Sequence, residues 1–177
     1  MNKKDNLKSI FIRYFLLLIL SINGLFVFYF IFTPITIFPL YFIFSAFFDT
    51  LLDFANSIIY VQSIPIEIID ACVAGSAYYL LLIFNLSTPQ IKISTRLKMI
   101  SFSFLIFLIT NIIRIFVLTV MYIYQSPFFE IAHKVSWYAG SVIVVILIWF
   151  YQVKAYKILE IPFYSDLKFL YKKSFLK

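Results

Sequence analysis

The chain contains very little cysteine, histidine and glycine, and these shortages exclude several kinds of site. Its 177 residues include one cysteine, one histidine and three glycines. A single cysteine excludes an internal disulfide, and a single histidine argues against a histidine-rich metal centre. The glycines Gly24, Gly75 and Gly140 are too far apart for a P-loop or a Gly-x-Ser-x-Gly motif, and there is no His-Glu-x-x-His segment. The sequence therefore implies no metal and no other cofactor.

Charged residues are also scarce, whereas apolar residues are abundant. Charged side chains make up 13% of the chain and hydrophobic ones 63%, with apolar runs long enough to cross a bilayer. This composition predicts an integral membrane protein, and we expect one membrane domain over residues 1–177. A net charge of +7 would suggest nucleic acid in a soluble chain. Here the distribution of the charge explains it better, and no nucleic-acid partner is expected.

Four apolar stretches are expected to form transmembrane helices. The first is too long for the apolar part of a signal peptide, and no small-residue cleavage site follows it, so we interpret it as a retained anchor. Ser126-Pro127, before the fourth, is typical of a helix start, with Ser126 as the cap. The four stretches run roughly over residues 10–32, 71–86, 99–124 and 131–153.

The distribution of Lys and Arg predicts that both termini are cytoplasmic. Cytoplasmic connections of membrane proteins collect basic residues. With four spans in the plasma membrane, the cytoplasmic segments hold thirteen of the fifteen basic residues, and only Arg114 and Lys134 lie on the outer side. The basic tail, residues 154–177, is expected at the inner surface, where its lysines meet anionic headgroups.

The segment over residues 34–69 is apolar but interrupted by prolines and polar residues. A fifth full span there would put the termini on opposite sides and spoil the charge partition. We therefore place it on the outer surface, as an interfacial helix around Leu40–Ala55 and an extended stretch over Ile58–Ile68. A helical hairpin that crosses twice is the alternative. The expected fold is an all-α membrane protein, a bundle of about four transmembrane helices with an extracytoplasmic interfacial segment between the first and second.

Arg114 is the most informative single residue. It lies in a stretch that is otherwise apolar from Met99 to Ile123, and a guanidinium in hydrocarbon costs at least ~3 kcal/mol. Such a charge is a functional candidate, through catalysis, pore lining or headgroup pairing. Arg114 is about fifteen residues from the cytoplasmic start of its helix, so it lies ~22 Å up, in the outer part of the membrane core.

The predicted topology brings Cys72 and His133 to the same outer side as the arginine. Asp70 can cap the second span, which puts Cys72 in the first helical turn, where the helix dipole favours a thiolate. His133 lies two turns after the predicted restart of the fourth span. Asn111 precedes the arginine by three residues and Glu130 precedes His133 by three, so each shares a helix face with the residue that it could orient. The alternative for Glu130 is a solvated side chain or a pair with Lys134 at the next turn.

These residues fit nucleophilic catalysis by sulfur. A cation and a helix N-terminus would favour the thiolate of Cys72, His133 can carry a proton to a leaving amine, and Arg114 can stabilise an oxyanion. Asp70 would oppose thiol ionisation unless backbone donors hold its carboxylate. Two other readings stay open. One is a non-enzymatic bundle, a transporter or assembly subunit in which Arg114 binds an anion or a partner, and the other is an intramembrane hydrolase.

Three segments resemble the exosortase and archaeosortase superfamily. Ala71-Cys72-Val73-Ala74-Gly75 is similar to its Cys-x-x-Gly start of a hydrophobic helix, and Asn111-Ile112-Ile113-Arg114-Ile115 to its Asn-x-x-Arg-Ile motif. His133, early in the following span, matches the third element. The resemblance covers roughly residues 58–153. Commoner members carry Ser or Thr and then Gly directly after the cysteine, so Val73-Ala74 departs from them, and the short chain resembles an archaeosortase-like branch.

This resemblance implies a membrane cysteine protease-transpeptidase with its active site outside. Members are held to cut a C-terminal sorting tail from secreted proteins, made of a short motif, a transmembrane helix and a basic cluster. They pass the new carboxyl end to an acceptor, a membrane lipid in archaea. By the same analogy Cys72 is the nucleophile, His133 the acid and base, and Arg114 the stabiliser of the oxyanion or thiolate.

Overall fold

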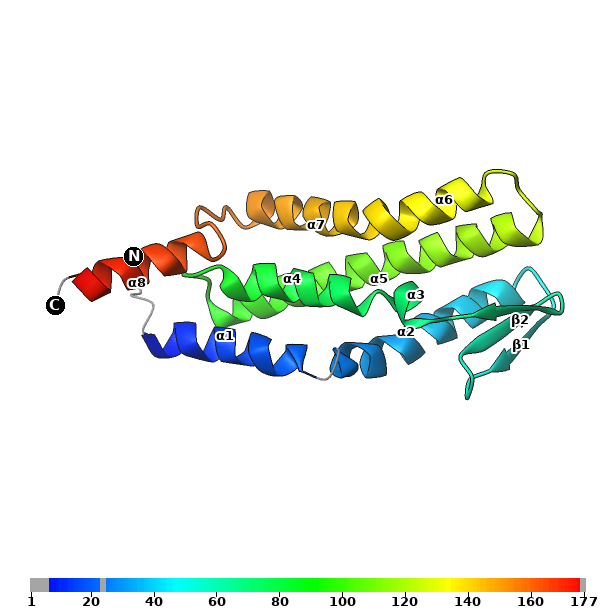
Figure 1. Cartoon of the computed structure of the whole chain (residues 1–177), viewed down its shortest axis with the longest axis horizontal. Coiled ribbons are helices and arrows are strands. Elements are labelled where there is room, and N and C mark those ends of the chain that lie inside the picture. Colours follow the sequence, from blue (N-terminus) through cyan, green and yellow to red (C-terminus); the bar gives the residue numbers. More distant parts are fainter. Residues whose placement is uncertain (1–6, 23–24, 176–177) are drawn as a thin grey trace.

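The computed structural model describes residues 7–22 and 25–175 and is a long helical bundle with a small β-sheet at one end (Figure 1). Lys3, Lys4 and Lys177 are three of the basic residues predicted to be cytoplasmic, and they lie outside the described residues. Gly24 lies outside them too. In chain order the elements are α1 (Leu7–Ser21), α2 (Phe26–Ser45), β1 (Thr50–Asp53), β2 (Ile58–Val61), β3 (Ile64–Glu67), α3 (Asp70–Val73), α4 (Gly75–Ser87), α5 (Ile93–Ile123), α6 (Phe129–Val135), a π-helical segment (Ser136–Gly140), α7 (Ser141–Ala155) and α8 (Tyr164–Phe175).

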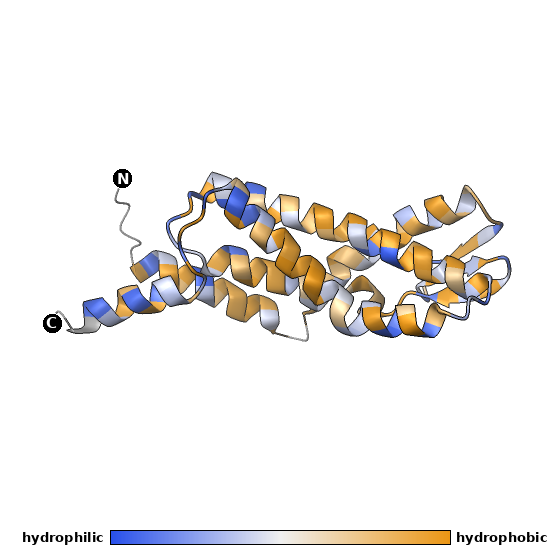
Figure 2. Ribbon diagram, turned by 90° about the horizontal axis from the view of Figure 1, so that it is seen from above, coloured by the Kyte–Doolittle hydropathy of each residue, from blue (hydrophilic) through white to orange (hydrophobic). Residues whose placement is uncertain are grey.

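Among the described residues, four helical segments are long and apolar enough to cross a membrane. They lie along the axis of the bundle between the end that holds α8, called the terminal end below, and the end that holds β1–β3, called the sheet end (Figure 1). Hydrophobic residues dominate the middle of the bundle, and hydrophilic ones gather towards the two ends (Figure 2). This is the construction of a multi-pass membrane protein. The segments are Phe26–Ser45, Asp70–Ser87, Ile93–Ile123 and Phe129–Ala155.

The first predicted span, residues 10–32, does not match one helix. α1 ends at Ser21, and α2 begins at Phe26 and continues to Ser45. The two helices lie end to end along the bundle (Figure 1). Pro34 and Pro39 lie inside α2 without ending it, because neighbouring helices in a membrane bundle support a helix that lacks individual N–H donors.

The predicted interfacial helix at Leu40–Ala55 is replaced by the end of α2 and the start of a sheet. β1, β2 and β3 form a three-stranded antiparallel sheet in the order β1-β2-β3. The extended conformation expected over Ile58–Ile68 is present, as β2 and β3, and the alternative of a helical hairpin is not realised. Gln62 and Ser63 join these strands with φ of 50° and 67°, as a two-residue type I′ turn requires. The fold is therefore mainly helical rather than all-α.

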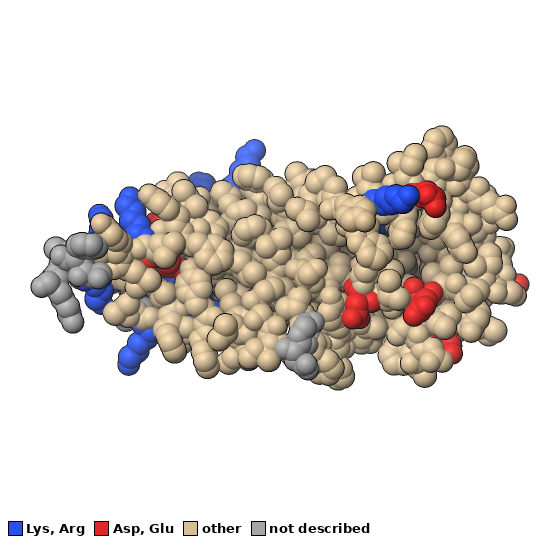
Figure 3. Space-filling model, in the orientation of Figure 1, with Lys and Arg blue, Asp and Glu red and all other residues tan. Residues whose placement is uncertain are grey.

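Charges are segregated between the two ends, as the topology argument requires. In Figure 3 most basic side chains lie at the terminal end, and acidic ones gather at the sheet end. Lys134 forms an ion pair with Glu130 at 3.1 Å.

Aromatic side chains lock α2, α4 and α5 together in the middle of the bundle. Tyr78 is fully buried, stacks on Phe32 with a centroid distance of 3.6 Å, and meets Phe107 edge-on at 4.8 Å. Phe104 adds edge contacts to both Phe32 and Tyr78. Such contacts stabilise helices whose outer faces are as apolar as the lipid around them.

At the terminal end, two arginines bind the C-terminal carbonyls of α4. Arg13 donates to the carbonyl oxygens of Leu86 at 3.1 Å and Thr88 at 3.0 Å. Arg96 donates to the same two oxygens at 3.0 and 2.9 Å. Cations at a helix C-terminus satisfy its last carbonyls and complement its dipole. Arg13 also forms a buried ion pair with Asp166 at 2.9 Å, which ties α8 to α1 and α4.

We expect Asp166→Ala to lower the free energy of unfolding by about 3 kcal/mol, because it removes the buried carboxylate that pairs with Arg13 and accepts a hydrogen bond from Tyr14. Thermal unfolding in detergent micelles, followed by circular dichroism, measures the change. Lys172→Ala, an exposed substitution on the same helix, should leave the melting temperature unchanged. Equal melting of the Asp166→Ala and wild-type proteins would show that α8 is not anchored through this pair.

Candidate functional site

Cys72 lies in a single helical turn between the sheet and α4. α3 begins directly after the extended residues that follow β3, and the Cys72 N–H donates to the Ile69 carbonyl at 2.8 Å. Ala74 then adopts φ 58° and ψ 45°, the left-handed region, which ends α3 and starts α4. The predicted position in the first turn is confirmed. The turn is too short to carry the dipole that the sequence argument assigned to it, because that dipole grows with aligned peptide units.

The break at Ala74 frees backbone carbonyls inside the bundle, and side chains of α5 satisfy them. Asn111 Nδ2 donates to the Cys72 carbonyl at 2.8 Å. Arg114 donates to the same oxygen at 3.1 Å and to the Ala71 carbonyl at 3.4 Å. Because irregular backbone at membrane depth needs such partners, α5 fixes the position of Cys72 through its main chain.

Arg114 bridges this turn and α7. One terminal nitrogen donates to Ser141 Oγ at 3.0 Å while the other holds the carbonyls of α3. Its Nε is buried and has no hydrogen-bond partner, and among the described residues Arg114 forms no ion pair with a carboxylate. No carboxylate of the described residues therefore neutralises the positive charge of Arg114, and one of its N–H donors, Nε, is unused.

His133 lies on α6, across from α3. Its ring stacks on Phe129 with centroids 5.5 Å apart and meets Trp137 edge-on at 5.7 Å. α6 begins at Phe129, with Phe128 as its N-cap, so the helix starts two residues after the position that Ser126-Pro127 predicted. A π-helical segment follows α6, and such segments often occur at functional sites.

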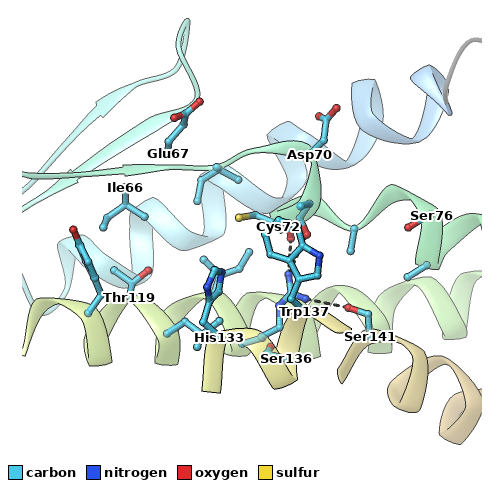
Figure 4. Close-up of a pocket in the computed structure, with 18 of the residues that line it drawn as sticks. Ile66, Glu67, Asp70, Cys72, Ser76, Thr119, His133, Ser136, Trp137 and Ser141 are labelled. Atoms are coloured by element: carbon cyan, nitrogen blue, oxygen red, sulfur yellow. Dashed lines mark hydrogen bonds between the residues drawn. The ribbon is translucent and has the colours of Figure 1, made fainter. Parts of the chain in front are cut away.

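Glu130 does not orient His133. Its carboxylate binds Lys134 at 3.1 Å, and both side chains are largely exposed. Asp70 does not cap α3 either, because the N-cap is Ile69 and no side chain caps the helix. Figure 4 shows the Asp70 carboxylate on the side of α3 away from α5, whereas Cys72 faces the cavity. Asp70 also contributes to the cavity lining, but its carboxylate lies on the side of α3 opposite to α5, the helix that carries the guanidinium (Figure 4).

A cavity of 660 Å³ joins these residues at the sheet-end half of the bundle. Cys72, Arg114 and His133 all line it, together with residues of β3, α5 and α7. In Figure 4 the sulfur of Cys72 and the imidazole of His133 face the same space. Its volume is in the range of sites that bind small molecules or peptide side chains. The structure therefore brings together three residues that are 42 and 19 positions apart in sequence.

The glycine three residues after Cys72, Gly75, lies where α4 packs closely against α2. A Cβ at this position would lie 2.7 Å from the ring of Tyr29 on α2, so only glycine allows α4 to start against that ring. Tyr29 and Ser141 were not identified from the sequence. A serine directly after Gly140 in an apolar span was the available signal for Ser141, since small polar residues bond neighbouring helices.

Within the part of the chain that the structure describes, no three His, Cys, Asp or Glu side chains cluster as metal ligands would. No protein-family model, no curated protein and no solved structure matches this chain.

Proposed function

We propose that this protein is a membrane cysteine peptidase that acts on protein segments outside the cell membrane. The observation that carries the proposal is the cavity that Cys72, Arg114 and His133 line together from three different helices. A packing role for the cysteine requires no such cavity, whereas a nucleophile requires access to substrate.

The reaction proceeds through a thioester. The Cys72 thiol gives its proton to His133, and the thiolate attacks the carbonyl carbon of a peptide bond. The charge that develops on oxygen is stabilised by the cation of Arg114, which lines the same cavity. The C–N bond breaks as His133 donates a proton to the leaving amine. Water, or a hydroxyl or amine acceptor deprotonated by the same histidine, then attacks the thioester carbonyl carbon. The C–S bond breaks, and His133 returns the proton to sulfur, which restores the thiol.

The resemblance to exosortases and archaeosortases makes transfer the favoured outcome. The substrate would then carry a C-terminal sorting tail, and the acceptor would be a membrane lipid. Ala74 supports the resemblance, because the position where commoner members carry glycine here has φ 58°, a conformation that favours glycine.

The contacts of Arg114 also support a second candidate. Its hydrogen bonds hold the broken helix of α3 and Ser141, so a non-enzymatic bundle could use Arg114 for structure alone. That reading gives no role to the thiol of Cys72. The two candidates differ in whether removal of the sulfur matters.

The C-termini of surface proteins provide the test. Peptide mass spectrometry on cells with the wild-type protein and with Cys72→Ala should find truncated C-termini only in the former. A free carboxyl end on those products would indicate hydrolysis, and a lipid-linked end would indicate transfer. Identical C-termini in both strains would overturn the proposal.

The proposed topology makes a separate prediction. With both termini in the cytoplasm, Cys72 faces outward, and a membrane-impermeant maleimide should label it in intact cells. Because the chain has one cysteine, Cys72→Ala is a complete control for the label. Labelling that occurs only after the cells are broken open would contradict both the orientation and an outward-facing site.

A further inference from the structure

The free edge of β3 borders the cavity. β3 pairs with β2 on one side only, because the sheet order is β1-β2-β3. Pro65, Ile66, Glu67 and Ile68 all line the cavity that contains Cys72. The other edge of the sheet, along β1, does not border this cavity.

The register determines which backbone groups of this edge are unused. Ile68 donates its N–H to the Ser57 carbonyl at 2.9 Å, so its backbone faces β2. Since neighbouring residues of a strand face opposite sides, Ile66 and Ile64 also face β2, whereas Glu67 and Pro65 face the free edge. The edge offers the N–H and carbonyl of Glu67 and the carbonyl of Pro65. Among the described residues none of the three has a backbone hydrogen bond to another element.

We propose that a protein segment in extended conformation binds as an additional strand along β3, at the border of the cavity that contains Cys72. This inference rests on the proposed function and specifies how that site holds its substrate. The Pro65 carbonyl, the Glu67 N–H and the Glu67 carbonyl follow one another as acceptor, donor and acceptor, a pattern that matches an extended polypeptide and no lipid or small anion. The strand leads directly into α3, so a segment that pairs with Glu67 continues towards the thiol.

Strand addition recognises the backbone of the bound segment, whereas the residues that line the cavity determine which of its side chains fit. Ile66 points into the cavity, while the Glu67 carboxylate lies on the other face of the strand (Figure 4). Alternate residues of the bound segment would therefore meet the apolar side of β3 and the aromatic residues of α6. We expect small or apolar side chains at those alternate positions.

The test uses disulfide exchange with Cys72 and does not depend on catalysis. The probe is a peptide library, Ac-Xaa-Xaa-Xaa-Xaa-Cys-NH₂, and its matched control is the same library with every peptide nitrogen methylated. Purified protein in nanodiscs is equilibrated with each library against β-mercaptoethanol, and intact mass gives the fraction of mixed disulfide. Cystamine, which has no peptide bonds, reports the reactivity of the thiol itself.

Wild-type protein should capture the unmethylated library about tenfold better than the methylated one. Glu67→Pro removes one edge donor and should lower that preference by about three- to tenfold, the effect of one backbone hydrogen bond. Thr50→Pro, at the first residue of the opposite edge strand, should keep the preference. Glu67→Ala retains the N–H and should lose less than twofold.

Equal capture of both libraries, or a preference that survives Glu67→Pro, would overturn strand addition. An equal loss in Glu67→Ala would assign binding to the carboxylate and would also overturn it. Spontaneous disulfide dimers of a Glu67→Cys, Cys72→Ala protein would assign the edge to a second copy of the chain. A different experiment tests the proposed function, which would be wrong if Cys72→Ala left the processed C-termini of surface proteins unchanged.

Discussion

Cys72→Ala should abolish processing while the protein remains inserted and folded. The side chain is small and partly buried, so its loss costs little packing, whereas a nucleophile has no substitute in this cavity. Removal of a nucleophile lowers turnover by at least about a thousandfold. The measurement is the ratio of full-length to processed substrate on a gel, for a secreted protein with a C-terminal apolar helix and basic cluster.

Cys72→Ser separates catalysis from packing. A serine hydroxyl has nearly the volume of the thiol but is much harder to deprotonate, and the histidine that would activate it must also serve the leaving group. We expect a loss of about a hundredfold or more. Ser76→Ala, also in the cavity lining, is the matched control and should process normally. Wild-type rates in Cys72→Ala would leave the non-enzymatic bundle as the better interpretation.

Arg114→Lys should be nearly as damaging as Arg114→Ala. The guanidinium spans from the Cys72 carbonyl to Ser141 Oγ, with hydrogen bonds of 3.1 and 3.0 Å from two different nitrogens. A lysine ammonium is a single point of donors and cannot reach both sides. Loss of one hydrogen-bond donor to a developing oxyanion costs about 10²- to 10³-fold in rate.

The fold should survive these substitutions, because Asn111 still donates to the Cys72 carbonyl at 2.8 Å. Ser141→Ala removes only one partner of Arg114 and should slow processing by a few-fold, since the net contribution of one hydrogen bond is about 1 kcal/mol. Near-normal processing in Arg114→Lys would reduce Arg114 to a simple positive charge, as an anion-binding or structural role requires. Thermal unfolding of each variant distinguishes lost activity from lost structure.

Much of the candidate site could be predicted from local features of the chain. The rise of a helix and the distribution of basic residues place Arg114, Cys72 and His133 at one end of the bundle, and the structure brings all three to one cavity. The sequence left two partners open for Glu130. The structure confirms the pair with Lys134 at the next turn, because an exposed i,i+4 partner on the same helix competes with the ring of His133.

The sequence by itself determined the membrane class, the number of long apolar helices and the end of the molecule at which the unusual polar residues lie, because composition, helix length and charge distribution are local or additive properties. Only the tertiary structure decided that residues 50–67 form a sheet, that the chain breaks at Ala74, and that Arg13 pairs with Asp166, 153 positions away. The register of the strands and the partners of the unpaired carbonyls depend on contacts between residues far apart in sequence. No local pattern specifies those contacts, since each backbone group can bond any partner of suitable geometry.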